Sequence, residues 1–97
     1  IDKQGKLCLI ASPDGGGNAV KIHADARVYV GLFHGAQSQH FDLNPKRKAY
    51  AHLIRGSLEI NGIQLSSGDA LLIEGESKLT IGNGGNAEVL VFDLDPQ

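Results

Sequence analysis

Short apolar segments separated by glycine-rich turns run along the whole chain. Within several of these segments apolar and polar residues alternate, which is typical of strands with one face buried in a sheet. No segment carries the apolar spacing of an amphipathic helix. We therefore predict an all-β domain of about nine short strands and no helix. The ranges 48–55 and 57–60 are expected as separate strands, as are 78–81 and 87–94.

Glycines mark the ends of these predicted strands. Gly56 interrupts the pattern after Arg55, and we expect the chain to turn a corner there. Asn61-Gly62 lies between two apolar runs and predicts a type I′ hairpin turn. Residues 15–17 and 82–86 are expected as plain loops. The connections are too short for crossover helices, so the strands should pair antiparallel in a small sandwich or barrel.

Composition limits the function classes. The chain has 97 residues, of which 41% are hydrophobic, and a net charge of −2. This length fits one domain with a single core. The largest basic cluster is Lys46-Arg47-Lys48, which we expect at a solvated strand start. We therefore expect no nucleic-acid partner.

No apolar stretch has the length of a membrane span, and no signal peptide is visible. We expect no membrane association and a cytoplasmic location. Cys8 is the one cysteine, so no disulfide partner is expected, and its apolar neighbours predict a buried small side chain. The sequence contains no methionine, which suggests a piece of a longer protein.

Three segments resemble one known family. Residues 53–70 read strand, glycine corner, strand, Asn-Gly turn, strand and Gly-Asp turn, which is similar to a cupin. The opening 5–14 and the closing 88–94 resemble the C-terminal half of pirin-like proteins, the quercetin dioxygenase-like family of two-cupin chains. This resemblance implies a cupin-type double-stranded β-helix, or jelly roll, forming a single small antiparallel barrel. Residues 1–97 would be one C-terminal cupin domain.

The resemblance also implies where a metal would be held. When the ligand spacing of a metal-bearing half is placed on Gly56 and Gly68 without gaps, the four ligand positions are occupied by Asp42, Asn44, Ile81 and Asn83. Only the first of these is a good ligand, whereas a transition-metal site wants three or four donors. We therefore expect no metal and no other cofactor in this domain. The resemblance places an ion such as Fe, Ni, Cu or Zn in the sister domain.

The side chains that remain as candidates lie on one predicted strand. His52 shares a strand face with Tyr50 and Ile54, while Ala51 and Leu53 occupy the other face. If the cupin register holds, the face of His52 looks into the barrel. His52 and Tyr50 are then either ordinary core residues or the lining of a small pocket. No catalytic residue is assigned.

Three functions stay open. The first is a non-catalytic, metal-free cupin domain with a structural role, packed beside a metal-bearing sister cupin. The second is a metal-dependent quercetin dioxygenase-like oxygenase that recruits its ligands outside the usual register, from His34, His40, His52 and Asp42. The third is a small-molecule-binding jelly roll that uses His52.

The expected partners are the sister cupin domain or a second copy of the chain. A cupin half without its sister would expose sheet edges, and such edges invite pairing. We expect no enzymatic activity of this chain alone under the first hypothesis, although the parent family includes metal-dependent quercetin dioxygenases.

Overall fold

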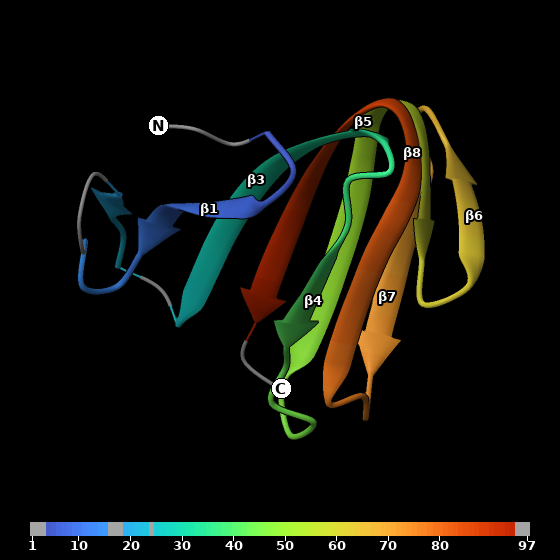
Figure 1. Ribbon diagram of the computed structural model, residues 1–97. Coiled ribbons are helices and arrows are strands. Elements are labelled where there is room, and N and C mark those ends of the chain that lie inside the picture. Colours follow the sequence, from blue (N-terminus) through green and yellow to red (C-terminus); the bar gives the residue numbers. More distant parts are fainter. Residues whose placement is uncertain (1–3, 16–18, 24, 95–97) are drawn as a thin grey trace.

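The computed structural model describes residues 4–15, 19–23 and 25–94, and these contain eight strands and no helix (Figure 1). The absence of helices among the described residues agrees with the alternating sequence pattern. The strands are, in chain order, β1 (Leu7–Ser12), β2 (Val20–Lys21), β3 (Ala26–Gly35), β4 (Gln39–Asp42), β5 (Lys48–Ile60), β6 (Ile63–Ser66), β7 (Ala70–Glu74) and β8 (Lys78–Leu94).

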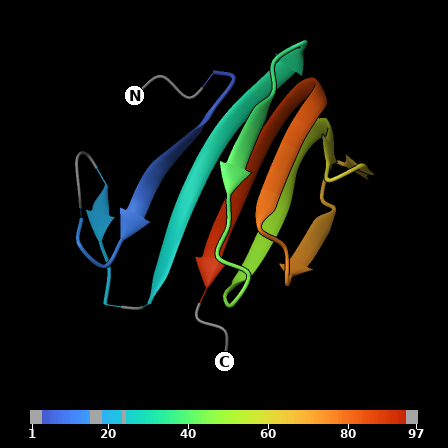
Figure 2. The same ribbon diagram turned by 60° about the horizontal axis from the view of Figure 1, so that its bottom comes forward.

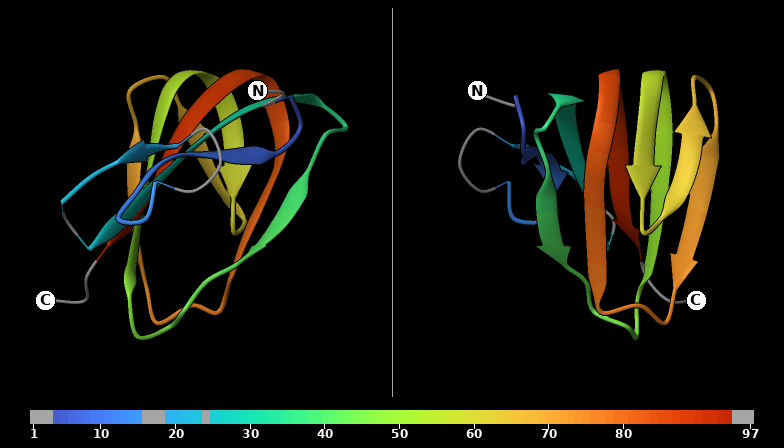
Figure 3. Two further views of the ribbon diagram at one scale, coloured as in Figure 1. Left: turned by 90° about the vertical axis from the view of Figure 1, so that its left-hand side faces the viewer. Right: turned by 45° about the vertical axis from the view of Figure 1, so that its right-hand side comes forward.

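Two long strands, β5 and β8, connect two layers. They pair with each other along most of their length and arch together over the top of the molecule in Figure 1. The first half of β5 pairs with β7, and its second half pairs with β6. The start of β8 pairs with β4, and its end pairs with β3. The result is a jelly roll whose first layer holds β7, β3, β1 and β2, and whose second layer holds β6 and β4 (Figures 2 and 3).

The roll is open along one edge. Within the described ranges, β6 and β7 each pair with β5 and not with each other. At the opposite edge, Tyr29 of β3 and Phe41 of β4 meet edge to face, with ring centroids 4.8 Å apart. Both rings pack against the core, and burial raises the pKa of the Tyr29 hydroxyl. One edge of the sandwich is therefore closed by aromatic packing, while the other remains open.

The core lies between the two layers and is apolar, with mostly aliphatic side chains. Residues that face each other across the strand pairs share a side of the sheet, so one alternate set from each strand points inward. The largest fully buried side chains are Phe33, Leu53, Leu58, Ile60, Leu79, Ile81, Val89 and Val91. Their burial supplies the main stabilisation of a domain of this size.

Glycines allow β5 and β8 to bend over each other. Gly56 has φ +81°, and a Cβ atom there would lie 2.4 Å from the carbonyl oxygens of both Gly85 and Asn86. Gly84 has a similar restriction, since its Cβ would lie 2.7 Å from the carbonyl oxygen of Phe33. The expected corner at Gly56 is confirmed, and its physical reason is the close approach of two backbones.

The hairpin predicted at Asn61-Gly62 is also confirmed. Ile60 pairs with Ile63 across it, and both turn residues have positive φ, +50° for Asn61 and +81° for Gly62, as a type I′ turn requires. The loop predicted at 82–86 is wrong, and the loop predicted at 15–17 is not tested. Residues 16 and 17 lie outside the described part of the chain, whereas 82–86 belongs to a strand.

The predicted strand breaks were wrong at two places. Residues 48–60 form one strand of 13 residues, and residues 78–94 form one strand of 17. Glycines at these places bend the ladder and shift its register without ending it. The expectation of purely antiparallel pairing also needs correction, because β1 and β2 pair parallel.

Arg47 departs from the expected solvated position. Its side chain is only 18% exposed, and its guanidinium lies 2.8 Å from Asp93 at the end of β8 and 3.0 Å from Asp25 just before β3. It also donates to the backbone carbonyl of Asp25. One side chain thus ties together three segments that are far apart in the sequence. Cys8, expected to be buried, is half-buried in β1.

A glycine pair tests the corner. We expect Gly56→Ala to lower the free energy of unfolding more than Gly62→Ala, although both residues have φ +81°. Each variant carries the strain of a left-handed alanine, about 1–2 kcal/mol. Only Gly56→Ala adds a clash, since nothing lies within 4 Å of a Cβ at Gly62. The added cost should be about 1–3 kcal/mol, measured by urea unfolding. Equal losses in the two variants would contradict the role of the corner.

The Arg47 ion pairs predict a pH dependence of stability. The hydrogen bond from Arg47 lowers the pKa of Asp25 below its ordinary value of 3.8. The contribution of this pair is therefore complete above that value and is lost as the pH falls through the lower pKa of the folded state. We expect the stability difference between the chain and Arg47→Gln to be constant near neutral pH and to narrow in acid. Urea unfolding at a series of pH values measures this stability difference. If the effect of Arg47→Gln on stability narrows equally in acid when Asp25 is already replaced by asparagine, the prediction is contradicted.

Candidate functional site

The interior of the roll is the place where a cupin would hold an ion, and in this chain it is filled by hydrocarbon. The inward-facing core cluster consists entirely of apolar side chains. Ser12 is the one buried polar side chain among the described residues, and its hydroxyl accepts a hydrogen bond from the backbone N–H of Gly15. No buried side-chain polar atom in the described ranges lacks a partner. The interior therefore offers no donor set to a cation, whose transfer into such a medium is costly.

The four ligand positions implied by the resemblance do not meet. Ile81 is fully buried in the core, whereas Asp42 is exposed and pairs across the ladder with Lys78. Asn44 uses its side-chain oxygen to accept from the N–H of Lys46 in a turn. Asn83 is exposed with φ +51° and donates its amide to Glu59. These residues do not fit a metal.

The histidines are dispersed as well. His34 accepts a hydrogen bond from the backbone N–H of Asn86, at 3.1 Å. The ring of His40 lies 3.2 Å from the Thr80 hydroxyl on β8. His52 is on the first half of β5, in the first layer, whereas β4, which carries His40, is in the second. No group of three or more His, Cys, Asp or Glu side chains in the described ranges is placed to hold a metal.

The predicted orientation of His52 and Tyr50 was wrong. Ala49, Ala51 and Leu53 point into the core, with exposures of 3%, 0% and 0%. Tyr50 is 37% exposed, and it alternates with them on the outer face of the first layer together with the half-buried His52. Neither side chain lines a cavity described below. The small alanines occupy the crowded interior, and the larger side chains are directed outward.

An apolar band covers this outer face. Tyr50 of β5 pairs with Leu72 of β7 on one side and with Phe92 of β8 on the other, and its ring lies 6.2 Å from that of Phe92. Phe92 in turn pairs with Val28 of β3. The next row places His52 beside Leu90. We call this surface the outer band, consisting of Val28, Tyr50, His52, Ile54, Leu72, Leu90 and Phe92.

Ion pairs flank the outer band at both ends. Lys48 and Glu74 lie 3.8 Å apart at one end, and Arg55 and Glu88 lie 3.0 Å apart at the other. Leu72 is 52% exposed and Ile54 is 41% exposed, so the large side chains between these pairs reach solvent. An apolar centre with a polar rim is the usual anatomy of a protein interface. Sequence reasoning missed this surface because it placed the outer face of β5 inside.

Two hollows lie on the second layer and its open edge. The first, of about 420 Å³, is lined in part by Gly82, where the strand has no side chain. Polar side chains from β4, β5 and β8 surround it, including His40, Glu59, Thr80 and Asn83. Two of its polar contacts are internal, since Asn83 bonds Glu59 and His40 contacts Thr80.

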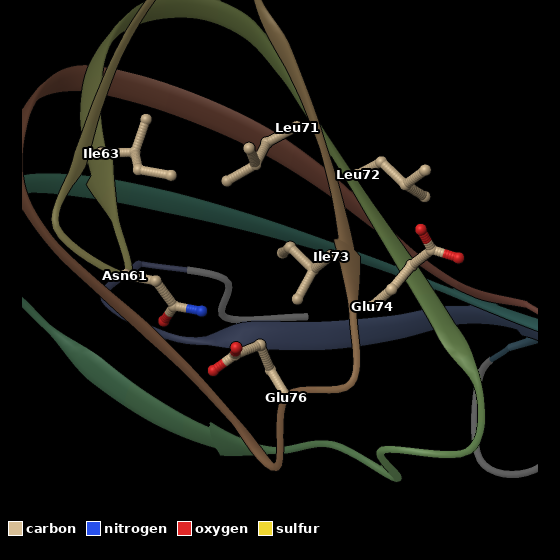
Figure 4. A pocket seen from close by; sticks show the side chains of 7 residues that line it. All are labelled: Asn61, Ile63, Leu71, Leu72, Ile73, Glu74 and Glu76. Carbon is tan, nitrogen blue, oxygen red and sulfur yellow. The ribbon is translucent and has the colours of Figure 1, made fainter.

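The second hollow lies between β6 and β7 at the open edge, and we call it the β6–β7 cleft (Figure 4). It has a volume of about 270 Å³. Its lining residues are Asn61, Ile63, Leu71, Leu72, Ile73, Glu74 and Glu76. In Figure 4 the side chains of Leu71 and Ile73 point to one side of β7, toward Ile63, and those of Leu72 and Glu74 point to the other.

The fold defines a class. A roll of two mainly antiparallel layers, whose two longest strands bend together at glycine corners, is a cupin jelly roll. The profile of the family described as the quercetinase C-terminal cupin domain matches residues 9–94. The chain belongs to this family, and the resemblance stated from the sequence is confirmed.

Individual relatives agree with this assignment. A protein named quercetin 2,3-dioxygenase from Escherichia coli K12 is 35% identical over 94 residues, which are 96% of this chain and 40% of that protein. The crystal structure of the bacterial pirin YhhW from Escherichia coli in complex with nickel(II) is similar at a TM-score of 0.89 and 28% identity. That similarity covers 94% of this chain and 40% of that one.

The chain therefore spans about 40% of the length of the relatives it matches. A cupin domain of a transcriptional regulator from Enterobacter cloacae has a TM-score of 0.63 at 11% identity, over 74% of this chain and 83% of that one. This last similarity shows the fold alone. No helix in the described ranges is long and apolar enough to cross a membrane.

Proposed function

We propose that this chain is a non-catalytic, metal-free cupin domain, formed by residues 1–97, that packs against a metal-bearing sister cupin. The observation that carries the proposal is the outer band, an apolar surface bounded by ion pairs on the first layer. The sister domain would belong to the part of the parent protein that the matched relatives have in addition. The ion there, such as Fe, Ni, Cu or Zn, and any dioxygenase chemistry would be functions of the sister domain.

The packed interior supports the non-catalytic part of the proposal. A cation in this roll would need three or four donors, and the described inward-facing side chains supply apolar groups instead. Introducing a ligand set would require replacing several core side chains at a cost of about 2–5 kcal/mol each.

The exposure of the outer band supports the packing part. Three of the five large hydrophobic side chains that are exposed in the described ranges, Tyr50, Ile54 and Leu72, lie on it. Monomeric proteins rarely leave a contiguous apolar patch of this kind uncovered, and such patches mark interaction sites. Salt bridges at the two ends would then form the solvated rim of the interface.

The two other hypotheses from the sequence receive less support. The oxygenase hypothesis needs His34, His40, His52 and Asp42 at one centre, whereas no three such side chains in the described ranges are placed to hold a metal. The binding hypothesis based on His52 needs a pocket beside that side chain, and His52 lies instead within the outer band.

A metal-loading experiment tests the non-catalytic part. We expect the purified chain, incubated with Fe(II), Ni(II), Cu(II) or Zn(II) and then desalted, to retain far less than one ion per chain by mass spectrometry. The reason is the apolar interior, which offers no ligands among its described side chains. Near-stoichiometric retention that is unaffected by replacing the exposed His40 with alanine would contradict the proposal, because it would require an internal site.

A self-association experiment tests the outer band. In the absence of a sister domain, we expect two copies to cover each other's bands, so that sedimentation velocity shows a dimer at micromolar concentration. Leu72→Glu should shift the equilibrium to monomer, since it places a charge in the middle of the contact. Val20→Glu is the matched control, because Val20 is 65% exposed but lies on β2, away from the band. A similar shift in both variants, or a monomer without any substitution, would contradict this prediction.

A further inference from the structure

At the open edge of the roll, one apolar side chain on the inward face of β6 is exposed to solvent. Ile63 pairs with Ile60 across the hairpin, so both face the interior, yet Ile63 is 47% exposed and Ile60 is 0% exposed. Leu65, two residues further on the same face of β6, is 5% exposed. The difference arises because β6 and β7 do not pair with each other in the described ranges, so no strand covers the interior at this point.

The wall opposite Ile63 is also apolar and continuous with the core. Leu71 and Ile73 of β7 pair with Ala51 and Ala49 of β5 and therefore point inward. Ile73 is 6% exposed and belongs to the core cluster, against which Leu71 packs. The β6–β7 cleft, with its volume of about 270 Å³, is thus an entrance lined by three branched aliphatic side chains. An apolar cavity of about 150 Å³ is already enough to hold a benzene molecule.

The polar groups at the cleft differ in how far they are already engaged in hydrogen bonds or ion pairs. The Asn61 amide is held by two hydrogen bonds, since it donates to the carbonyl of Lys78 and accepts from the N–H of Thr80 at 2.7 Å. Glu74 points away on the other side of β7, toward Lys48 at 3.8 Å (Figure 4). Glu76 lies on the cleft side, with its carboxylate directed toward Asn61. It makes no hydrogen bond or ion pair with another described residue.

We propose that the β6–β7 cleft binds a small aromatic or alicyclic amine, with its ring between Ile63, Leu71 and Ile73 and its ammonium group beside Glu76. The apolar walls supply the contact area, and the carboxylate selects a cationic head over a neutral or anionic one. The cleft adjoins the outer band at Leu72, but its ring and head-group contacts use other residues and do not depend on the role proposed for that surface.

A ligand series tests the chemical class. Benzylamine, benzyl alcohol and phenylacetate have similar rings and differ in the charge of the head group. In an NMR titration of the chain, we expect benzylamine to shift the amide signals of β6 and β7 with a dissociation constant of about 1 mM, which is reasonable for a ligand of this size. The alcohol should bind more weakly and the acid weakest. Absence of shifts at about ten times that concentration, or shifts confined to other strands, would overturn the proposal.

Two matched variants separate the head-group contact from general charge. Glu76→Gln should weaken benzylamine about two- to fivefold, as expected for an exposed ion pair, and leave benzyl alcohol unchanged. Asp14→Asn removes the same charge from the loop after β1, away from the cleft, and should change neither ligand. If the two variants behave alike, the cation is attracted by overall charge, and the assignment of Glu76 is wrong.

A third variant tests the ring site itself. Ile63→Trp enlarges a side chain that is already half-exposed, so the fold should persist, as the dispersion of the NMR spectrum will report. The indole should occupy the cleft and abolish binding of both benzylamine and benzyl alcohol. If both still bind with their original constants, the ring does not lie in the β6–β7 cleft. If a polypeptide binds in the cleft but no member of the ligand series does, the small-amine assignment is likewise contradicted.

Discussion

The close contact between the backbones of β5 and β8 at Gly56 is the constraint on which the rest of the structure depends. Both strands must pass from one layer to the other at the same place, and the carbonyl oxygens of Gly85 and Asn86 lie where a Cβ on residue 56 would be. Because the two strands bend together, their ladder continues through the corner with shifted register. Because of this shared bend, the paired strands β5 and β8 contribute to both layers of the sandwich. The other strands extend one layer or the other.

The position of the corner also decides which side chains are inside. Side chains alternate along β5, so the register at Gly56 fixes Ala49, Ala51 and Leu53 inward and directs Tyr50 outward. The same alternation on β8 buries Val89 and Val91. Among the described residues the core cluster consists of apolar side chains, mostly alanine and branched aliphatic ones. The apolar lining of the described interior thus follows from the orientation of several strands rather than from one residue.

Local features of the fold could be predicted from the sequence, and features that depend on two distant segments could not. The Asn61-Gly62 turn and the glycine corner each follow from the conformational freedom of one or two residues. The orientation of β5 could not be derived, because both of its faces carry apolar residues and alternation alone does not say which one is buried. The ion pairs of Arg47 join segments 22 and 46 residues away in the sequence, and the β6–β7 cleft depends on two strands that fail to pair.

The composition of β8 supports the proposal that a partner covers the outer band. A strand with one solvated face alternates between apolar and polar residues, whereas a strand covered on both faces is apolar throughout. From Val89 to Phe92 the strand has four apolar residues in succession, of which Leu90 and Phe92 belong to the outer band. The start of β8 has the other pattern, since Thr80 is exposed beside the buried Leu79 and Ile81. One continuous strand therefore changes from a solvated to a doubly apolar pattern at its corner, and that change separates the layer facing water from the layer that carries the outer band.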